Sequence, residues 1–471
     1  MARSGVTHEG ALYELLARGN KDLYFFNDDP KSISPYDNRY NPVPAQLHEL
    51  RRIPPLNGAD FGRTCEFEFE AAGEVFTDPT LLIDLPSWLP PVQATANPKA
   101  TVTDIDGVTY GYTNGTAYFL FSKIQIYQDQ ILLQEFSGDA LYMASRARGS
   151  LNSAFLDNKI TGVHTGSALD IGRAATPGRL RLHLPLLGCQ HPDDGGFPSI
   201  AARGQTYKLR LTLRRLEDLV EASDSRAKPV PWARSDFTIQ TSATTAPTSF
   251  STLQRSAIGV PTIQLETRHI YVDPDTRERL TRSELIIPFS RLYENTFTYG
   301  AKDYEPISRG AVASGTRRID ATHPAGRIVF WFYKTADLRA NKYTKITQDN
   351  GGDYYNNVSL IIASRDREPL ATSLLWNKIQ HFSKEERDPG AGMGTMNWDL
   401  GDLRGREGPY QHQPEGAINF TTADRPTMYT DLTDVPIDSV TRQKSTEMHV
   451  IVDAWAIAVF EKGRGGLKYA N

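Results

Sequence analysis

Hydrophobic and polar residues alternate along most of this chain. In "CEFEFEA", Cys65, Phe67 and Phe69 fall on one face of an extended strand, and three glutamates fall on the other. The stretches "RLRLHLPLL" (179–187) and "YKLRLTLRRL" (207–216) repeat the pattern. A period of two is typical of strands with one face in a core and one face in water. Turns rich in Pro, Gly, Asp and Asn separate these runs, so the pattern predicts an all-β fold of antiparallel sandwiches or barrels.

Two of the apolar runs make more specific predictions. The stretch "YFLFSKIQIYQDQILLQEF" (118–136) predicts two paired strands with a polar hinge near Gln128 and Asp129. The stretch "AGRIVFWFYK" (325–334) is apolar almost without interruption. A strand of that kind has no face for water, so we expect it to be buried on both sides.

Helix signals are scarce, and the clearest lies near the N-terminus. In "EGALYELLARG" (9–19), Leu12, Leu15 and Leu16 share one face and Gly19 is placed as a C-cap. A proline-punctuated stretch follows to about residue 60 and predicts an extended arm, ordered against a neighbour.

A segment rich in Ser, Thr, Ala and Pro (235–257) separates two β-rich halves. A chain of 471 residues fits two domains of about 200 residues each with additional segments. The predicted organisation is an N-terminal helix and arm (1–60), a first β domain (61–222), a linker (223–260) and a second β domain (261–471).

Composition narrows the function classes. The net charge is −4, so no basic excess favours binding to nucleic acid. The two cysteines, Cys65 and Cys189, are too few for a disulfide framework and are expected to be reduced and half-buried in a cytosolic setting. The sequence has no apolar signal core and no run of 18 apolar residues, which predicts a soluble protein.

Residues suited to catalysis or metal binding are nearly absent. Jelly-roll metal enzymes use a His-x-His pair, which this sequence lacks, and His412 with Glu415 would supply only two ligands. His323 precedes an apolar strand, where a histidine that hydrogen-bonds backbone is the ordinary expectation. No Walker A, HExxH or G-x-S-x-G pattern occurs. We therefore predict no catalytic residue, no metal and no cofactor.

Three Asn-x-Ser/Thr sequons occur, at Asn114, Asn357 and Asn419. Because the sequence shows no signal peptide, each is expected to be an unmodified asparagine.

Several motifs, in order, resemble those of the double jelly-roll major capsid proteins of nucleocytoplasmic large DNA viruses. In the first half these are "TLLIDLP", "ILLQEFSGDALYMASRA" and "LPLLGC". In the second half, "HIYVDPDTRERL", "THPAGRIVFWFYK" and "HQPEGAINFT" precede a terminal "GGLKYAN". The residues that match the family's motifs in the second half are Asp273, Asp275, Arg277, His323, Pro324, Gln413, Pro414, Gly416, Asn419 and Phe420. The departures, such as Thr276 in place of the usual glutamate, indicate a divergent member.

The resemblance implies two consecutive eight-stranded antiparallel jelly rolls, and a structural role for the matching residues. It implies a homotrimer that forms pseudo-hexagonal capsomers and tiles an icosahedral shell in the virion. Implied partners are neighbouring capsomers, minor capsid and penton proteins and an internal membrane, with no direct nucleic acid. Assembly would take place in the host cytoplasm or a viral factory.

Three alternatives stay open at this stage. They are a related assembly scaffold, a jelly-roll metal enzyme and a carbohydrate-binding protein with Trp88, Trp398 and Tyr410 as exposed aromatic platforms.

Overall fold

The computed structural model describes most of the chain after residue 45. The described residues are 46–69, 72–91, 101–147, 161–162, 179–190, 195–226, 230, 232, 237–240, 248–304, 314–384, 390–398 and 416–468. The segment Gln46–Asn471 forms one compact unit. The predicted helix at 9–19 and most of the predicted arm lie outside the described residues.

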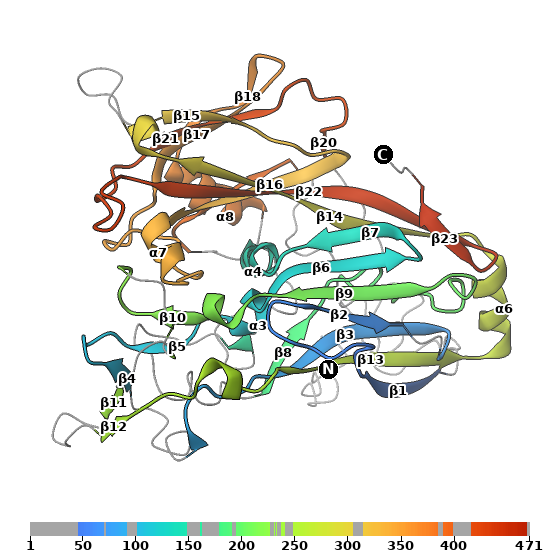
Figure 1. Cartoon of the computed structure of the whole chain (residues 1–471). Coiled ribbons are helices and arrows are strands. Elements are labelled where there is room, and N and C mark those ends of the chain that lie inside the picture. The colour runs from blue at the N-terminus through green and yellow to red at the C-terminus, as the bar shows by residue number, and fades with distance from the viewer. Residues whose placement is uncertain are drawn as a thin grey trace, which may run out of the picture. The chain divides into compact units, whose positions relative to one another are not determined.

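Two four-stranded antiparallel sheets form what we call the first sandwich (Figure 1). One sheet has the order β1-β13-β3-β8, with β1 at Gln46–Ile53, β13 at Thr262–Val272, β3 at Val75–Asp84 and β8 at Arg179–His183. The other has the order β2-β9-β6-β7, with β2 at Thr64–Glu68, β9 at Tyr207–Leu213, β6 at Phe121–Gln128 and β7 at Ile131–Phe136.

The strands of the first sandwich follow the alternation of the sequence. In β9, the side chains of Tyr207, Leu209 and Leu211 are buried, and the residues between them are half-exposed. The predicted pair of strands at 118–136 is confirmed as the hairpin of β6 and β7, which begins at Phe121, whereas Tyr118 and Phe119 belong to the helix α3 (Thr116–Phe119). The turn of the hairpin includes Asp129, whose φ of 52° lies in the left-handed region that Asp tolerates better than most residues.

The second sandwich also consists of two antiparallel sheets. The first has the order β14-β22-β16-β19, with β14 at Leu285–Tyr299, β22 at Thr446–Glu461, β16 at Pro324–Lys334 and β19 at Met393–Asn397. The short strands β20 (Ile418–Asn419) and β23 (Arg464–Leu467) pair with β16 and β22. The second has the order β15-β21-β17-β18, with β15 at Ser314–Arg318, β21 at Thr427–Leu432, β17 at Tyr355–Ile362 and β18 at Arg365–Thr372.

Five short strands form two small sheets beside the first sandwich. Strand β4 (Thr101–Asp104) pairs with β11 (Phe237–Gln240), which pairs with β12 (Thr248–Phe250). Strand β5 (Tyr110–Tyr112) pairs with β10 (Val220–Ala222). Because β11 and β12 fall in the range predicted as a linker (223–260), part of that range is hydrogen-bonded strand.

Short helices connect the strands. They are α3 (Thr116–Phe119), α4 (Gly138–Ala147), α6 (Pro274–Arg282), α7 (Thr335–Arg339), α8 (Gln380–Lys384), the π-helix η8 (Leu375–Ile379) and the 3₁₀ turns η4 (Leu216–Asp218), η6 (Arg255–Ala257) and η7 (Ala301–Tyr304). Helix α6 connects β13 of the first sandwich to β14 of the second, so the chain crosses between the sandwiches at this helix.

The pairing of β1 with β13 was not apparent from the sequence. Strand β1 falls in the predicted arm (1–60) and β13 in the predicted second domain (261–471), yet β1 pairs along its whole length with β13 in the first sandwich. Strand partners far apart in sequence leave no local pattern, because alternation records only which face of a strand is buried. The four predicted domain ranges stay predictions.

Each sandwich has its own apolar core. Cys65 and Cys189 are buried free thiols, a deeper burial than the half-buried state expected from the sequence. Burial raises the pKa of the Cys65 thiol to about 12, which keeps it protonated and unreactive. None of the helices described here is long and apolar enough to cross a membrane.

Candidate functional site

The two sandwiches meet at the sheet β14-β22-β16-β19, in which β16 and β19 are buried on both faces. In β16, the side chains of Ile328, Phe330 and Phe332 belong to the core of the second sandwich. The intervening Val329, Trp331 and Tyr333 belong to the core of the first. Strand β22 also contributes to both cores, with Met448, Val450, Val452 and Ala454 in the second and Ile451, Ala456, Ala458 and Phe460 in the first. The prediction that 325–334 is buried on both sides is confirmed.

Because these strands contribute to both cores, the junction between the two sandwiches is itself hydrophobic core. Each large apolar side chain removed from water contributes roughly 1.5–3 kcal/mol. The apolar side chains on the first-sandwich side of β16 and β22 therefore hold the two sandwiches together strongly. We take the junction as the candidate functional site because it turns two sandwiches into one building block.

A buried ion pair lies inside this sheet. Arg327 Nε is 2.9 Å from Asp453 Oδ2, and both side chains are only 3% exposed. The two residues face each other across β16 and β22. The hydroxyl of Ser290 on β14 donates to the other carboxylate oxygen, Asp453 Oδ1. A buried charge is tolerated only with such a partner, so the trio fixes the register of three strands.

Ser290 also connects the trio to the first sandwich. Gln190 accepts a hydrogen bond from Ser290 N at 2.7 Å and donates to Ser290 O at 3.0 Å. Gln134 on β7 donates to the same carbonyl at 3.2 Å. Amide side chains from the first sandwich thus hydrogen-bond the backbone of β14 at Ser290.

A second set of amides holds the terminal hairpin of β22 and β23. Gly465 N donates to Gln205 Oε1 at 2.7 Å, and Gln128 donates to Gly465 O. Gly204 N donates to Gly463 O at 2.7 Å. A Cβ atom at Gly465 would lie 2.6 Å from the Tyr207 hydroxyl, so only glycine allows this approach. The motif "GGLKYAN" therefore begins with a residue that the junction requires.

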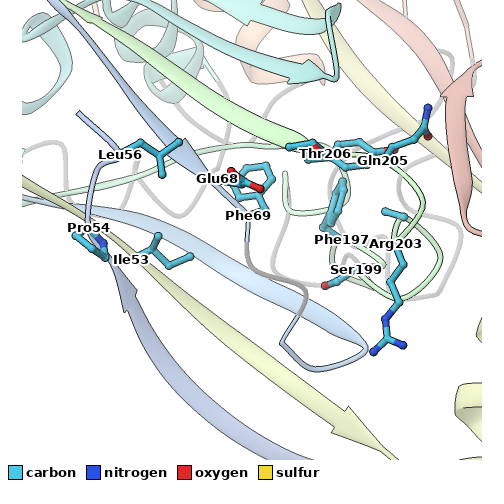
Figure 2. A pocket seen from close by; sticks show the side chains of 12 residues that line it. Ile53, Pro54, Leu56, Glu68, Phe69, Phe197, Ser199, Arg203, Gln205 and Thr206 are labelled. Carbon is cyan, nitrogen blue, oxygen red and sulfur yellow. The ribbon is translucent and has the colours of Figure 1, made fainter. Parts of the chain in front are cut away.

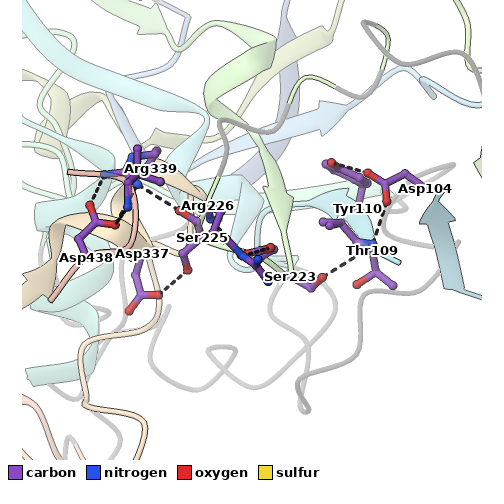
Figure 3. A network of polar contacts seen from close by, with 12 residues as sticks. Asp104, Thr109, Tyr110, Ser223, Ser225, Arg226, Asp337, Arg339 and Asp438 are labelled. Carbon is purple, nitrogen blue, oxygen red and sulfur yellow. Dashed lines mark hydrogen bonds and ion pairs between the residues drawn. The ribbon is translucent and has the colours of Figure 1, made fainter. Parts of the chain in front are cut away.

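Polar contacts also connect the small sheets to the second sandwich (Figure 3). The Ser225 hydroxyl donates to Asp337 Oδ1 at 3.2 Å, and Arg339 of α7 donates to Ser225 O at 3.3 Å. Arg339 also forms an ion pair with Asp438, at 2.5 Å from Nη2 to Oδ2. The hydrogen bond from Arg339 holds the pKa of Asp438 well below its ordinary value. Thr109 N donates to Ser223 Oγ at 3.0 Å, which extends the network to β5.

The predicted motif residues Asp273, Asp275 and Arg277 lie at the crossover helix α6. Asp273 is the N-cap of this helix, and its carboxylate accepts a hydrogen bond from Thr276 N at 3.2 Å. Hydrogen bonds from the Thr276 side chain and backbone lower the pKa of Asp273. Asp275 lies in the first turn, where a negative charge favours the helix dipole. Arg277 reaches Glu74 at 3.6 Å, so the motif anchors the crossover.

The structure brings the two other motifs together. Strand β20 pairs with the start of β16, placing Asn419 opposite Pro324. Phe420 N donates to His323 O at 3.1 Å, and His323 N donates to Thr421 Oγ1 at 2.9 Å.

The side chains of these motifs contribute to the same contact. The buried His323 ring hydrogen-bonds Tyr293 at 2.6 Å, and its φ of 70° is left-handed. Asn419 Oδ1 accepts from Thr421 N at 3.0 Å, and Phe420 is buried in the second core.

Gly416 is described and half-buried, whereas Gln413, Pro414, His412 and Glu415 lie outside the described residues. Within the described ranges, no group of three or more His, Cys, Asp or Glu could hold a metal ion.

Sequence reasoning missed the polar residues of the junction. Their signal was a polar residue within an apolar strand, as with Gln134 in "ILLQEF", Arg327 in "AGRIVFWFYK" and Asp453 in "VIVDAWAIAVF". A polar side chain at such a position has to find a partner when it is buried.

No family model and no curated protein matches the chain. Solved structures do match. A chain of the PBCV-1 virus capsid in a quasi-atomic model is 15% identical with a TM-score of 0.67, over 93% of this chain and 100% of that one. The Faustovirus major capsid protein is 12% identical with a TM-score of 0.59, over 91% and 92%. A chain of the Sputnik virophage is 10% identical with a TM-score of 0.53, over 94% and 92%.

These neighbours have the same two-sandwich architecture. The fold is a double jelly roll. The resemblance drawn from sequence motifs is confirmed for the fold across nearly the whole chain, even though the identities are 15% or less. Each sandwich described above is one of the two jelly rolls, and the junction is the contact between them.

Proposed function

We propose that this protein is a structural major capsid protein of a large double-stranded DNA virus. The observation that carries the proposal is the junction, where one sheet contributes side chains to both cores and a buried ion pair links two of its strands. Two jelly rolls joined in this way form a block with little internal freedom. The structural neighbours, two of which are named as capsid or major capsid proteins, support the same role.

In this role the chain forms a homotrimer. Three copies related by threefold symmetry place six jelly rolls in a ring, which gives a pseudo-hexagonal outline and lets one chain tile a flat facet. The interface between copies in an obligate trimer would exceed about 2,000 Å². Its partners are neighbouring capsomers, minor capsid and penton proteins and an underlying membrane, with no direct contact to nucleic acid, and its location is the capsid shell. No turnover of a substrate is involved.

The proposal is tested by the mass of the purified protein in solution. Size-exclusion chromatography with light scattering should give three times 52.5 kDa at micromolar concentration. Negative-stain images of the same sample should show particles with a pseudo-hexagonal outline. A strict monomer at that concentration would rule out the trimer.

A related scaffold protein would also form trimers. Mass spectrometry of mature particles separates the two roles, because a capsid protein is present there in the highest copy number and a scaffold is absent.

A further inference from the structure

Strand β1 has one edge that pairs with no other strand, which we call the free edge. It is the outer strand of the sheet β1-β13-β3-β8, and in the described part of the chain its only strand partner is β13 (Figure 1). The backbone N–H and C=O groups that point away from β13 therefore have no strand partner in this sheet. Such an edge is a template for a further extended segment.

The free edge is open on both faces of the sheet. Residues 46–50 are all exposed, and Leu47 and Leu50, which lie on opposite faces, are 66% and 54% exposed. This exposure leaves room for another strand beside β1. The free edge ends at Pro54, which has no N–H to donate and lies with Ile53 in the wall of a pocket (Figure 2).

The edge strand β18 shows how the same fold protects an edge. It is the outer strand of the sheet β15-β21-β17-β18 and contains Pro369. A proline within an edge strand removes a donor and discourages further pairing. Strand β1 contains no proline, and its pairing with β13 has no bulge. Its free edge is therefore regular over eight residues.

The sequence of β1 is complementary to itself in one antiparallel register. An antiparallel edge presents its backbone groups at every second residue, so two copies of one strand pair only in registers that place odd positions opposite odd ones. Centring the pair on Leu50 places Glu49 of each copy opposite Arg51 of the other. The exposed Leu50 side chains of the two copies then face each other.

The neighbouring registers bring like charges together. Centring the pair on Glu49 places two glutamates opposite each other, and centring it on Arg51 does the same with two arginines. Like charges directly opposite each other destabilise a strand pair. In the favoured register His48 falls opposite Arg52, whose charge is already balanced by Glu266 at 3.0 Å.

Glu49 and Arg51 are available for the contact between copies. They form an ion pair at 3.2 Å within one chain, with side chains 46% and 35% exposed. The Tyr271 hydroxyl donates to Glu49 at 2.7 Å, which holds the carboxylate on this face of the sheet. Two such pairs brought together alternate in sign, so each carboxylate gains a second guanidinium.

We propose that β1 pairs with β1 of a second copy of this chain, antiparallel and about a twofold axis at Leu50. The pairing joins the two sheets into one. The contact is small beside the roughly 1,200 Å² of a stable complex, so it suits repeated use within an assembly. It does not require the threefold contacts proposed above: between trimers it links one trimer to another, and between monomers it forms a dimer.

A single introduced cysteine tests the axis. In Leu50→Cys two thiols face each other, with Cα atoms about 4.5–5.5 Å apart, within the range for a disulfide. Cys65 and Cys189 are buried, so the introduced thiol is the reactive one. Mild oxidation of the full-length protein should give disulfide-linked dimers on non-reducing electrophoresis.

Gln46→Cys is the matched control, because Gln46 is exposed on the same strand and the same face as Leu50. In the favoured register the two copies of position 46 are about 26 Å apart. We therefore expect about tenfold less dimer from this variant than from Leu50→Cys.

Charge reversal tests the register. For the parent we expect a dissociation constant on the order of 100 μM, measured by sedimentation equilibrium. Glu49→Arg should weaken the association about tenfold, because an arginine at this position falls opposite Arg51. Glu49→Arg combined with Arg51→Glu should restore the parent value, because opposite signs face each other again.

Two results would overturn the proposal. One is an equal yield of dimer from Leu50→Cys and Gln46→Cys, and the other is a double reversal that associates no better than Glu49→Arg alone. The masses separate this inference from the proposed function. Trimers that do not pair through β1 keep the capsid proposal and remove this one, whereas monomers that pair through β1 support this one and rule out the trimer.

Discussion

At the scale of single residues, close packing makes some positions intolerant of any change. Gly138, the first residue of α4, packs against the backbone of α3 and the start of β6. A Cβ atom there would lie 1.9 Å from the carbonyl oxygen of Tyr118 and 2.7 Å from that of Phe121. Because these are backbone atoms, they cannot move aside as a side chain could.

We expect Gly138→Ala to lower the free energy of unfolding by about 3 kcal/mol or more, through overpacking of the α4 contact. Thermal and urea unfolding measure the loss. Gly58→Ala is the control, because a Cβ at Gly58 meets no atom within 4 Å. Equal stability of the two variants would contradict the packing described here.

A second residue-scale prediction concerns Asp438, whose pKa the hydrogen bond from Arg339 lowers. Because the folded-state pKa lies below the ordinary value of 3.8, the folded protein binds fewer protons than the unfolded chain in the window below that value. The contribution of Asp438 to stability is therefore complete above pH 3.8 and is lost as the pH falls through the folded-state pKa.

Asp438→Asn should lower the free energy of unfolding at pH 7 by about 2 kcal/mol, since it removes a charged partner of Arg339. The difference from the parent should shrink below pH 3.8, where the parent loses the same contribution. Urea unfolding between pH 3 and 7 measures it. Asp320→Asn serves as the control, because its pair with Arg318 is exposed and should contribute less than about 1 kcal/mol.

At the scale of elements, the hairpin of β17 and β18 contains an unfavourable turn. Ala363 and Ser364 have φ of 53° and 59°, both left-handed. Two-residue hairpins of this type prefer Asn-Gly, because side chains with a Cβ atom are strained there. The amide of Ala363 donates to Asp424 O at 2.8 Å, which holds the turn in place.

Ser364→Gly should therefore raise the free energy of unfolding by about 1 kcal/mol, because glycine adopts the left-handed region without strain. Thermal unfolding measures the gain. The same change at Ser283, whose φ is −76°, should have no benefit and lower stability slightly. A loss of stability in Ser364→Gly would show that the serine makes a contact that outweighs its strain.

At the scale of the whole molecule, the junction decides whether the two jelly rolls behave as one body. Its apolar contacts supply most of the stabilisation, and the Arg327–Asp453 pair supplies specificity of register. Removing one member of a buried pair leaves the other charge without compensation, which is far more unfavourable than replacing both.

Asp453→Asn is expected to lower the free energy of unfolding by about 3–5 kcal/mol, and the double change Arg327→Met with Asp453→Leu by less. Unfolding in urea, followed by circular dichroism and tryptophan fluorescence, compares the two. Glu461→Gln removes the exposed pair with Lys462 and should change stability by less than about 1 kcal/mol. A double variant less stable than the single one would show that the pair itself is the main source of stability.

The sequence by itself determined several of the strands and the faces that they bury. The alternation in β9 and the hairpin of β6 and β7 were predictable because burial of one face leaves a period of two in the apolar residues. The two-sided burial of β16 was predictable because it leaves an apolar run without interruption. The order of the motifs also indicated the double jelly roll.

The tertiary structure alone decided which strands pair and where the buried polar groups find partners. The pairing of β1 with β13 and the contacts of Gln190 and Ser290 join residues about 100 or more positions apart. Asp273, His323 and Asn419 were identified as motif residues, but their roles at the crossover helix and the β16–β20 contact became visible only in three dimensions. The physical reason is that a hydrogen bond or ion pair depends on two positions at once, whereas a sequence pattern records the environment of one.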